Sequence, residues 1–311
     1  MIYHAIYHPA LEDYTQDGAM TINGLLKGLE NAGNQHSDSV CDGAIGRDRA
    51  GKAWILTDWQ VEIYRRPRYC IPLQIQTWQR AARATFALFR EYLVSDGQPG
   101  YAARAVSRLV LMDMESQRII RPGDALVQLY TPEDQRVFED PGVEKLREPD
   151  RYAQQICLSL RRSDIDYNEH VHNLCYLDFA LEALPLSVYQ RQADFHKLRI
   201  VYKSPVKAGT TLVCRYAAEE QRHIVGIYGE DEGLRTLVSL GWKSWRSLPE
   251  TQDHPGQEMK RPTSTIAWGR ICMVSCFFCL GFFAYLSLYR LDQFYNRDHR
   301  KGQRQGHPIL G

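Results

Sequence analysis

The chain has 311 residues, of which 44% are hydrophobic and 24% charged. This length allows two ordinary domains with a real core, and the composition excludes a disordered or fibrous chain. Residues 261–311 carry seven Lys or Arg against two acids, which leaves 31 bases and 35 acids in residues 1–260 and a net charge of −4 there. A mildly acidic body argues against a broad nucleic-acid surface, so no nucleic-acid partner is expected.

The eight cysteines do not form the paired spacing of a zinc site. Cys276 and Cys279 have the CxxC form but lie within an apolar run. The histidines are scattered in the same way, so we expect no metal and no cofactor. Reduced thiols are the ordinary state in the cytoplasm, where we place the body of the protein.

The first half is predicted to be a helix followed by strands. Residues 19–39 carry leucines and an isoleucine at helical spacing, with Thr21 as a candidate cap. Four segments rich in β-branched or aromatic residues follow, separated by proline and glycine turns, at 53–67, 71–81, 83–96 and 100–116. Residues 1–130 are predicted to form the N-terminal domain.

The second half repeats this plan. Residues 131–150 are polar and proline-bearing and are predicted to be a linker to a C-terminal domain at 151–250. A strand at 151–160 precedes a helix-like run, and four more strand-like segments follow at 197–206, 210–220, 222–230 and 233–245.

Short matches between the halves indicate a degenerate repeat. "IYRRP" at 63–67 matches "VYKSP" at 201–205, and a match between helices pairs Glu30 with Glu182. On that register Asn168 faces Gln16 and His170 faces Gly18, so only the second half carries the asparagine and the histidine. The alternative is that any two units of helix and strands look alike at this level.

Residues 163–185, "SDIDYNEHVHNLCYLDFALEALP", crowd polar, proton-handling side chains ahead of an apolar helix. One interpretation is a plain helix cap at Ser163 or Asp164, followed by a core helix. The other is an active site, because unpaired N–H groups near His170 to Asn173 would face a substrate with the positive end of the helix dipole.

This motif resembles the D-x-D-x-N-x-H-V-N-N segment of the acyl-ACP thioesterases of plants and bacteria. "AWILTDWQVEIYRRP", "IQTW" and "SRLVLMDMESQRIIRP" resemble the first-half strands of that family, in the right order. The resemblance runs from about residue 10 to about residue 246. It implies an α+β protein of two tandem hotdog folds, each an antiparallel sheet wrapped around a helix, with the acyl chain lying largely in the first.

Carried over by position, the resemblance assigns catalytic roles to Asp166, Asn168 and His170. Asn168 would orient substrate or water, His170 would polarise the carbonyl or move the proton, and Asp166 would orient the group and fix the histidine tautomer. His172 stands where the family usually has asparagine. Pro205 stands where the family usually has a glutamate, and a proline cannot accept a proton.

Without that glutamate another group must act as base, or catalysis is slow. The candidates in this part of the sequence are His170, His172 and Glu182. Glu182 follows His170 by twelve residues, or roughly 18 Å along a helix at ~1.5 Å per residue, which disfavours it. Pro67 is predicted to be the first-half counterpart of Pro205.

Residues 271–289 form nineteen uncharged residues between two arginines. At ~1.5 Å per residue such a helix reaches about 28 Å, close to the thickness of a bilayer core. The sequence therefore predicts a transmembrane helix at 271–289 that anchors the cytoplasmic body, after a tether at 251–270 and before a basic tail at 290–311. The resemblance does not cover this segment.

The expected function is hydrolysis of fatty acyl-ACP thioesters, with acyl carrier protein and a fatty acyl chain as partners. An acyl-CoA thioesterase and a catalytically weak acyl-thioester-binding protein remain as alternatives, the second because of Pro205. A homodimer is left open. Arg65, Arg66 and Arg68, or Arg161 and Arg162, are candidates for docking the acidic carrier protein.

Overall fold

The computed structural model describes residues 1–43, 51–81, 86–139 and 145–242. Its first half holds nine elements, which are β1 (Tyr3–Tyr7), η1 (Leu11–Asp13), α1 (Ile22–Ser39), β2 (Lys52–Ile63), β3 (Leu73–Gln79), β4 (Ala87–Ser95), β5 (Ala103–Asp113), β6 (Arg118–Ile120) and α2 (Asp124–Gln128).

The second half holds nine more elements in the described residues. These are β7 (Gln154–Ser159), η2 (Arg162–Asp164), α3 (Cys175–Glu182), α4 (Leu186–Tyr189), η3 (Gln192–Asp194), β8 (Phe195–Tyr202), β9 (Thr211–Ala218), β10 (Arg222–Tyr228) and β11 (Leu234–Trp242).

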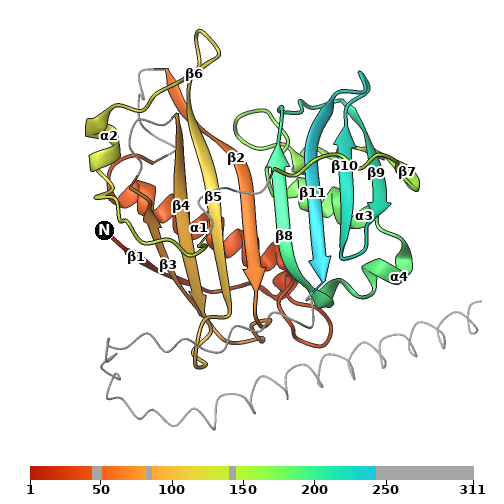
Figure 1. Cartoon of the computed structure of the whole chain (residues 1–311), viewed down its shortest axis with the longest axis horizontal. Helices are drawn as coiled ribbons and strands as arrows, with labels where there is room; N and C mark the ends of the chain where they lie inside the picture. The colour runs from red at the N-terminus through yellow and green to blue at the C-terminus, as the bar shows by residue number, and fades with distance from the viewer. Residues whose placement is uncertain (44–50, 82–85, 140–144, 243–311) are drawn as a thin grey trace, which may run out of the picture. The chain divides into compact units, whose positions relative to one another are not determined.

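All the strands join one antiparallel sheet in the order β1-β3-β4-β5-β2-β8-β11-β10-β9-β7, with β6 beside β5 (Figure 1). The order is symmetric about the β2–β8 pair, where Asp58 lies opposite Val201 and Glu62 opposite Lys197. Each half thus contributes five strands in the same order. The first half adds the long helix α1, and the second half adds the shorter helix α3. The expected α+β architecture of two tandem hotdog folds is confirmed.

The predicted helix and strands of the first half all appear, and so do the five strands of the second. The sequence interpretation missed β1, which pairs with β3 from Tyr3↔Thr77 to Tyr7↔Leu73. Four of its five positions are exposed or intermediate, so the segment carries too little apolar signal to be recognised alone. Only the pairing with β3 makes them a strand.

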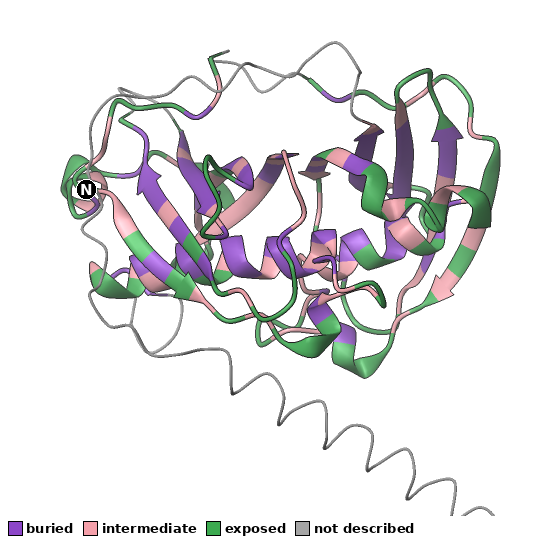
Figure 2. Cartoon of the chain, turned by 90° about the horizontal axis from the view of Figure 1, so that it is seen from below, coloured by how far each residue is buried: buried purple, intermediate pink, exposed green. Residues whose placement is uncertain are grey.

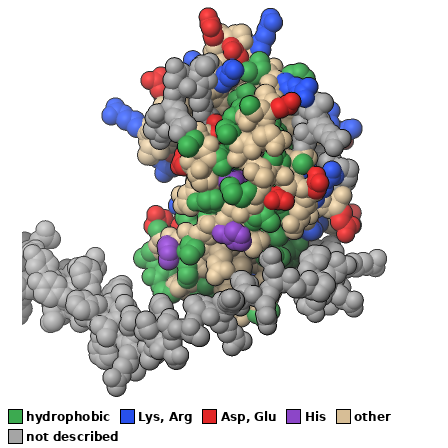
Figure 3. Space-filling model, turned by 90° about the vertical axis from the view of Figure 1, so that its left-hand side faces the viewer, with side chains coloured by type: hydrophobic (Ala, Val, Ile, Leu, Met, Phe, Trp, Pro, Cys, Tyr) green, Lys and Arg blue, Asp and Glu red, His purple; other side chains and the backbone are tan. Residues whose placement is uncertain are grey.

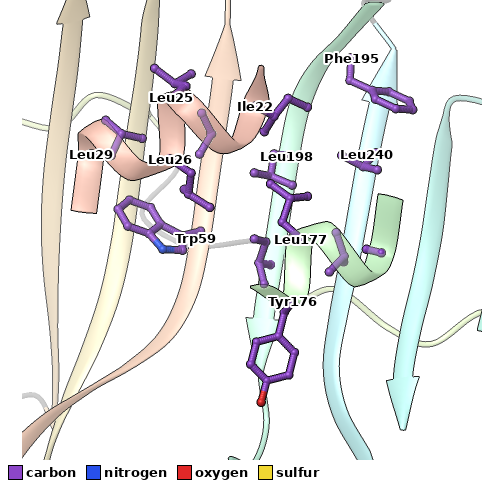
Figure 4. Packing of buried hydrophobic residues seen from close by; sticks show 14 of the residues in the cluster. Ile22, Leu25, Leu26, Leu29, Trp59, Tyr176, Leu177, Phe195, Leu198 and Leu240 are labelled. Atoms are coloured by element: carbon purple, nitrogen blue, oxygen red, sulfur yellow. The ribbon is translucent and has the colours of Figure 1, made fainter. Parts of the chain in front are cut away.

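The two halves share one hydrophobic core. Leu25, Leu26 and Leu29 of α1 and Leu177 of α3 are almost fully buried between the helices and the sheet. Figure 4 shows these side chains with Trp59 of β2 and Leu198 of β8 from the junction strands. Figure 2 shows the buried faces of the two helices and of the strands above them. Since side chains on a strand alternate between faces, this core uses one face of the sheet.

The opposite face of the sheet is partly covered by the linker. Trp78 packs there with Val137, and its indole N–H donates to the carbonyl of Gln135 at 3.0 Å. Leu146 forms a similar contact with Ile224 and Leu237 in the second half. The segment predicted as a linker therefore packs along the body, although it holds no strand in its described residues.

Thr21 caps α1 as predicted, because its hydroxyl accepts the Gly24 N–H at 2.9 Å. Thr21→Ala is expected to lower the free energy of unfolding by about 1 kcal/mol, the usual value of such a cap. Urea denaturation at 25 °C measures this. Asn31→Ala, at an exposed site within the same helix, should be neutral or slightly stabilising. Equal midpoints for Thr21→Ala and the parent chain would contradict the capping role.

The predicted membrane anchor is corrected. Within residues 1–43, 51–81, 86–139 and 145–242, no helix is long and apolar enough to cross a membrane. The longest of them, α1, has 18 residues and carries Lys27 and Glu30 near its middle, whereas a span needs about 20 mostly apolar residues. The membrane anchoring and the membrane-attached body are therefore withdrawn. The predicted tether, span and basic tail lie outside the described residues.

Candidate active site

The candidate site is a loop between η2 and α3. Its turn closes where the Asp166 N–H donates to the His170 carbonyl at 2.8 Å, and the Glu169 N–H donates to the Asp166 carbonyl at 3.0 Å. Glu169 has a φ of 61°, in the left-handed region that tight turns require. The Val171 N–H then donates to the Val206 carbonyl at 2.8 Å, which ties the loop to the segment after β8.

The three predicted residues come together on this turn. The Asp166 carboxylate accepts the Asn168 N–H at 2.8 Å and, more weakly, the Asn168 side-chain amide and the His170 N–H, both at 3.4 Å. Asn168 is exposed and His170 half-buried. The carboxylate therefore shapes the backbone, and the prediction that Asp166 bonds the imidazole and sets its tautomer is not supported by these contacts.

A matching turn in the first half lacks the asparagine and the histidine. There the Thr15 N–H donates to the Ala19 carbonyl at 2.8 Å and the Gly18 N–H donates to the Thr15 carbonyl at 2.8 Å. The bonding pattern therefore pairs Asp166 with Thr15 and His170 with Ala19. Gly18, with a φ of 76°, corresponds to Glu169.

The register predicted from the sequence was therefore wrong by one residue. It paired His170 with Gly18 because it was anchored on the helices. The helices start at different distances from the turn, however. α1 begins directly after Thr21, whereas α3 begins three residues after His172, the counterpart of Thr21.

The same correction applies to Pro205. The N–H groups of Lys203 and Ser204 donate to the Arg235 carbonyl, as those of Tyr64 and Arg65 donate to the Ala102 carbonyl. Pro205 thus corresponds to Arg66, and the predicted pairing with Pro67 is wrong. The physical consequence is unchanged, because Pro205 still offers no acid beside the loop.

The predicted helix cap at Ser163 or Asp164 is also wrong. Asp164 lies eleven residues before the start of α3, and its carboxylate instead accepts the Arg161 N–H at 2.8 Å and the Arg161 guanidinium at 2.7 Å. The Val171 and His172 N–H groups, which were expected to be free, donate to carbonyls of Val206 and Asp164. An oxyanion site built from those groups is therefore excluded.

A glutamate from the other half approaches the loop. Glu30 of α1 places its Oε1 3.7 Å from Nε2 of His172. A second contact of α1, this time with α3, joins the Asn23 amide to the Asp178 carboxylate. Sequence reasoning used Glu30 only as a marker of the repeat. The signal that could have found it is a single acid beside the apolar stripe of α1, next to Leu29 and one turn after Leu26.

The predicted docking arginines are mostly structural. Arg65 binds Asp96 at 2.9 Å, and Arg66 donates to the Gln192 and Phe195 carbonyls of the second half. Neither guanidinium is free for a partner. Arg161 is 68% exposed although it pairs with Asp164. The flank drawn in Figure 3 carries acidic and basic side chains interspersed, with hydrophobic ones between them, rather than a surface of one sign.

In the part of the chain that the structure describes, no group of three or more His, Cys, Asp or Glu side chains is arranged to hold a metal ion.

The sheet has two similar halves, and each half wraps around a helix. This arrangement defines a double-hotdog protein, in which only the second half carries the asparagine and the histidine. The acyl-ACP thioesterase N-terminal domain model matches residues 1–130, and the corresponding C-terminal domain model matches residues 147–236. The chain belongs to the acyl-ACP thioesterase family.

Among curated proteins, the chain is similar to oleoyl-acyl carrier protein thioesterase 1 of Arabidopsis thaliana, with 27% identity over 58% of this chain and 53% of the relative. It is 26% identical to the oleoyl-acyl carrier protein thioesterase of Coriandrum sativum, over 74% of this chain and 73% of the relative. The chain thus spans about half the length of the first relative. Both relatives are named as chloroplastic proteins, so the predicted cytoplasmic placement is withdrawn.

Two solved structures share the fold. The 12:0-ACP thioesterase from Umbellularia californica aligns with a TM-score of 0.69 at 18% identity, covering 78% of this chain and 97% of that one. An acyl-ACP thioesterase from Bacteroides thetaiotaomicron aligns with a TM-score of 0.68 at 18% identity, covering 78% and 98%.

Proposed function

We propose that the protein hydrolyses fatty acyl-ACP thioesters, releasing the fatty acid and the carrier protein. The observation that carries this proposal is the asymmetry of the two turns. Asp166, Asn168 and His170 gather on the second-half turn, whereas the equivalent first-half positions hold Thr15, Asp17 and Ala19, without an asparagine or a histidine. Family membership supports the same reaction, and two relatives are named for acyl-ACP substrates.

The roles of the three residues follow from their contacts. Asp166 holds the turn, so that Asn168 projects at the surface and His170 lies half-buried beside it. The exposed amide of Asn168 can orient water or the acyl carbonyl. The imidazole of His170 can polarise the carbonyl or carry a proton to the leaving sulfur, because an imidazole ring can both donate and accept a proton.

Acyl carrier protein is the proposed partner. Arg68 is exposed and pairs with Asp17, and the exposed Arg161 and Arg162 are the other predicted cations that remain for docking it. Arg161 and Arg162 lie directly ahead of the turn, so a carrier bound there would bring its acyl thioester close to His170. The acyl chain is proposed to enter the first half. The homodimer remains an untested prediction.

The test compares carriers on the full-length protein. Free thiol release is followed with oleoyl-ACP, palmitoyl-ACP and the corresponding acyl-CoA esters at equal concentration. We expect faster turnover on acyl-ACP. Faster turnover on acyl-CoA would instead establish the acyl-CoA thioesterase, and saturable binding of acyl-ACP without turnover would establish the weak acyl-thioester-binding protein.

A further inference from the structure

Glu30 lies on the first half but faces the loop between η2 and α3, which carries Asp166, Asn168 and His170. Its Oε1 is 3.7 Å from Nε2 of His172, and its side chain keeps 23% of its surface exposed. His172 is two residues beyond His170, on the same loop. The carboxylate is thus close to the candidate site although 142 residues of sequence separate it from His172.

The hydrogen bonds of His172 define what its ring offers to Glu30. Nδ1 of His172 accepts the Leu174 N–H at 3.3 Å. An accepting Nδ1 leaves the ring proton of the neutral imidazole on Nε2, which points at Glu30. His172 therefore directs its Nε2–H toward one oxygen of the carboxylate, across a gap longer than a hydrogen bond, and has no free nitrogen with which to act as a base.

The other oxygen of Glu30, Oε2, is buried and has no hydrogen-bond partner among the described residues. A buried carboxylate oxygen without a partner is costly, and native proteins keep one mainly where it has a function or binds water. Three other acids near the loop are engaged, and Glu169 on the loop is exposed. Asp164 binds Arg161, Asp166 binds the turn, and Asp178 accepts the Asn23 amide.

The charge environment suits a base. Burial raises the pKa of the Glu30 carboxyl above its usual range; the nearby His172 lowers it and Asp166 raises it. The charge of Glu30 in turn contributes to the raised pKa of Tyr92 of β4 and of Tyr202 of β8, although burial is the main cause of both. A carboxylate whose pKa moves toward neutrality is a stronger general base.

We propose that Glu30 is the general base of the hydrolysis, supplied by the first half to the site on the second, with His172 as its positioning residue. This inference rests on the proposed thioesterase function. Glu30 takes a proton from water as the water oxygen bonds to the acyl carbon. The tetrahedral oxyanion then collapses, the C–S bond breaks, and the sulfur leaves as a thiolate that takes up the proton held by Glu30. The products are the fatty acid and the carrier thiol.

The proposal accounts for two features of the chain together. Pro205 removes the acid that the resemblance places beside the loop, and His172 replaces the usual asparagine. A base supplied by α1 can replace the acid that is missing at Pro205. The imidazole of His172 orients this base, which gives a reason for a histidine at that position.

The experiment is a pH–rate profile of acyl-ACP hydrolysis for Glu30→Gln, Glu30→Asp and the parent full-length chain. We expect Glu30→Gln to lower kcat by about 100- to 10,000-fold. The parent profile should fall on its acidic side, where Glu30 becomes protonated, and this limb should disappear in Glu30→Gln. Glu30→Asp should recover part of the rate. Because His172 lowers the pKa of Glu30, His172→Asn should move the acidic limb to higher pH.

Glu182→Gln is the matched control, since Glu182 is exposed at the end of α3 and should leave the profile unchanged. Thermal unfolding checks that each variant folds, and Gln keeps the size of Glu. Activity of Glu30→Gln within threefold of the parent, with the acidic limb intact, would overturn the role of Glu30 alone. A parent chain that hydrolyses neither acyl-ACP nor acyl-CoA would instead overturn the thioesterase function and this inference with it.

Discussion

Replacing His170 by alanine is expected to lower kcat for acyl-ACP hydrolysis by about 100- to 10,000-fold, the usual contribution of a group that handles the proton or polarises the carbonyl. The fold should remain, because the first half already carries alanine at this position of its turn. Ala19 there accepts the Thr15 N–H at 2.8 Å, as His170 accepts the Asp166 N–H. Among the described residues the imidazole itself makes no side-chain hydrogen bond that the turn would lose.

Steady-state kinetics on acyl-ACP measure the effect, and circular dichroism and thermal unfolding report the fold. His4→Ala is the control, because His4 is exposed on β1 and far in sequence from the loop. Asn168→Ala should show a similar loss if its amide orients water or substrate. If the parent chain is active, a His170→Ala protein that keeps the parental kcat would exclude the imidazole from the chemistry.

Replacing Arg199 by methionine is expected to lower the free energy of unfolding by about 3–5 kcal/mol at pH 7, because it leaves a buried carboxylate without its partner. Arg199 of β8 holds Asp58 of β2 through two contacts of 2.7 and 2.8 Å, and the two side chains are only 13% and 9% exposed. These strands join the two halves, so the ion pair lies at the seam of the sheet.

The pH dependence of this loss has a definite sign. Burial raises the pKa of the Asp58 carboxyl, and Arg199 works against that shift. Without Arg199 the folded-state pKa rises further above the unfolded value. The folded protein with a charged Asp58 then has a higher free energy. The loss in free energy of unfolding is therefore largest above the folded-state pKa of Asp58 and becomes smaller as the pH falls below it. Urea denaturation of Arg199→Met at pH 7 and pH 5 tests this.

A double-mutant cycle provides the control. Asp58→Leu combined with Arg199→Met removes both charges, and replacing a buried pair by apolar side chains is often neutral or stabilising. The double variant should therefore recover most of the stability lost in Arg199→Met. If the double variant is as unstable as the sum of the two single variants, the coupling between Asp58 and Arg199 is absent and the prediction fails.

Much of the fold could be predicted because its signals are local. The apolar spacing of α1 and its cap at Thr21 lie within a few turns, and each strand of the second half carries its own alternation and flanking turn residues. The candidate residues Asp166, Asn168 and His170 were found for the same reason, since they occupy one short turn.

Local signals also misled. The polar residues at Ser163 and Asp164 looked like a helix cap, yet α3 begins only at Cys175. The intervening backbone closes the turn and bonds to Val206 instead of forming helical hydrogen bonds. Arg65 and Arg66 looked like a docking patch, but their guanidinium groups satisfy buried carbonyls and Asp96.

The sequence by itself determined two tandem units, the strand and helix content of each, and which unit carries the candidate catalytic side chains, since all of these depend on contacts within a few residues. Only the tertiary structure decided the register between the two turns, the ion pair at the seam and the approach of Glu30 to His172. Those contacts join residues more than 130 positions apart, and no periodicity along a single segment encodes them.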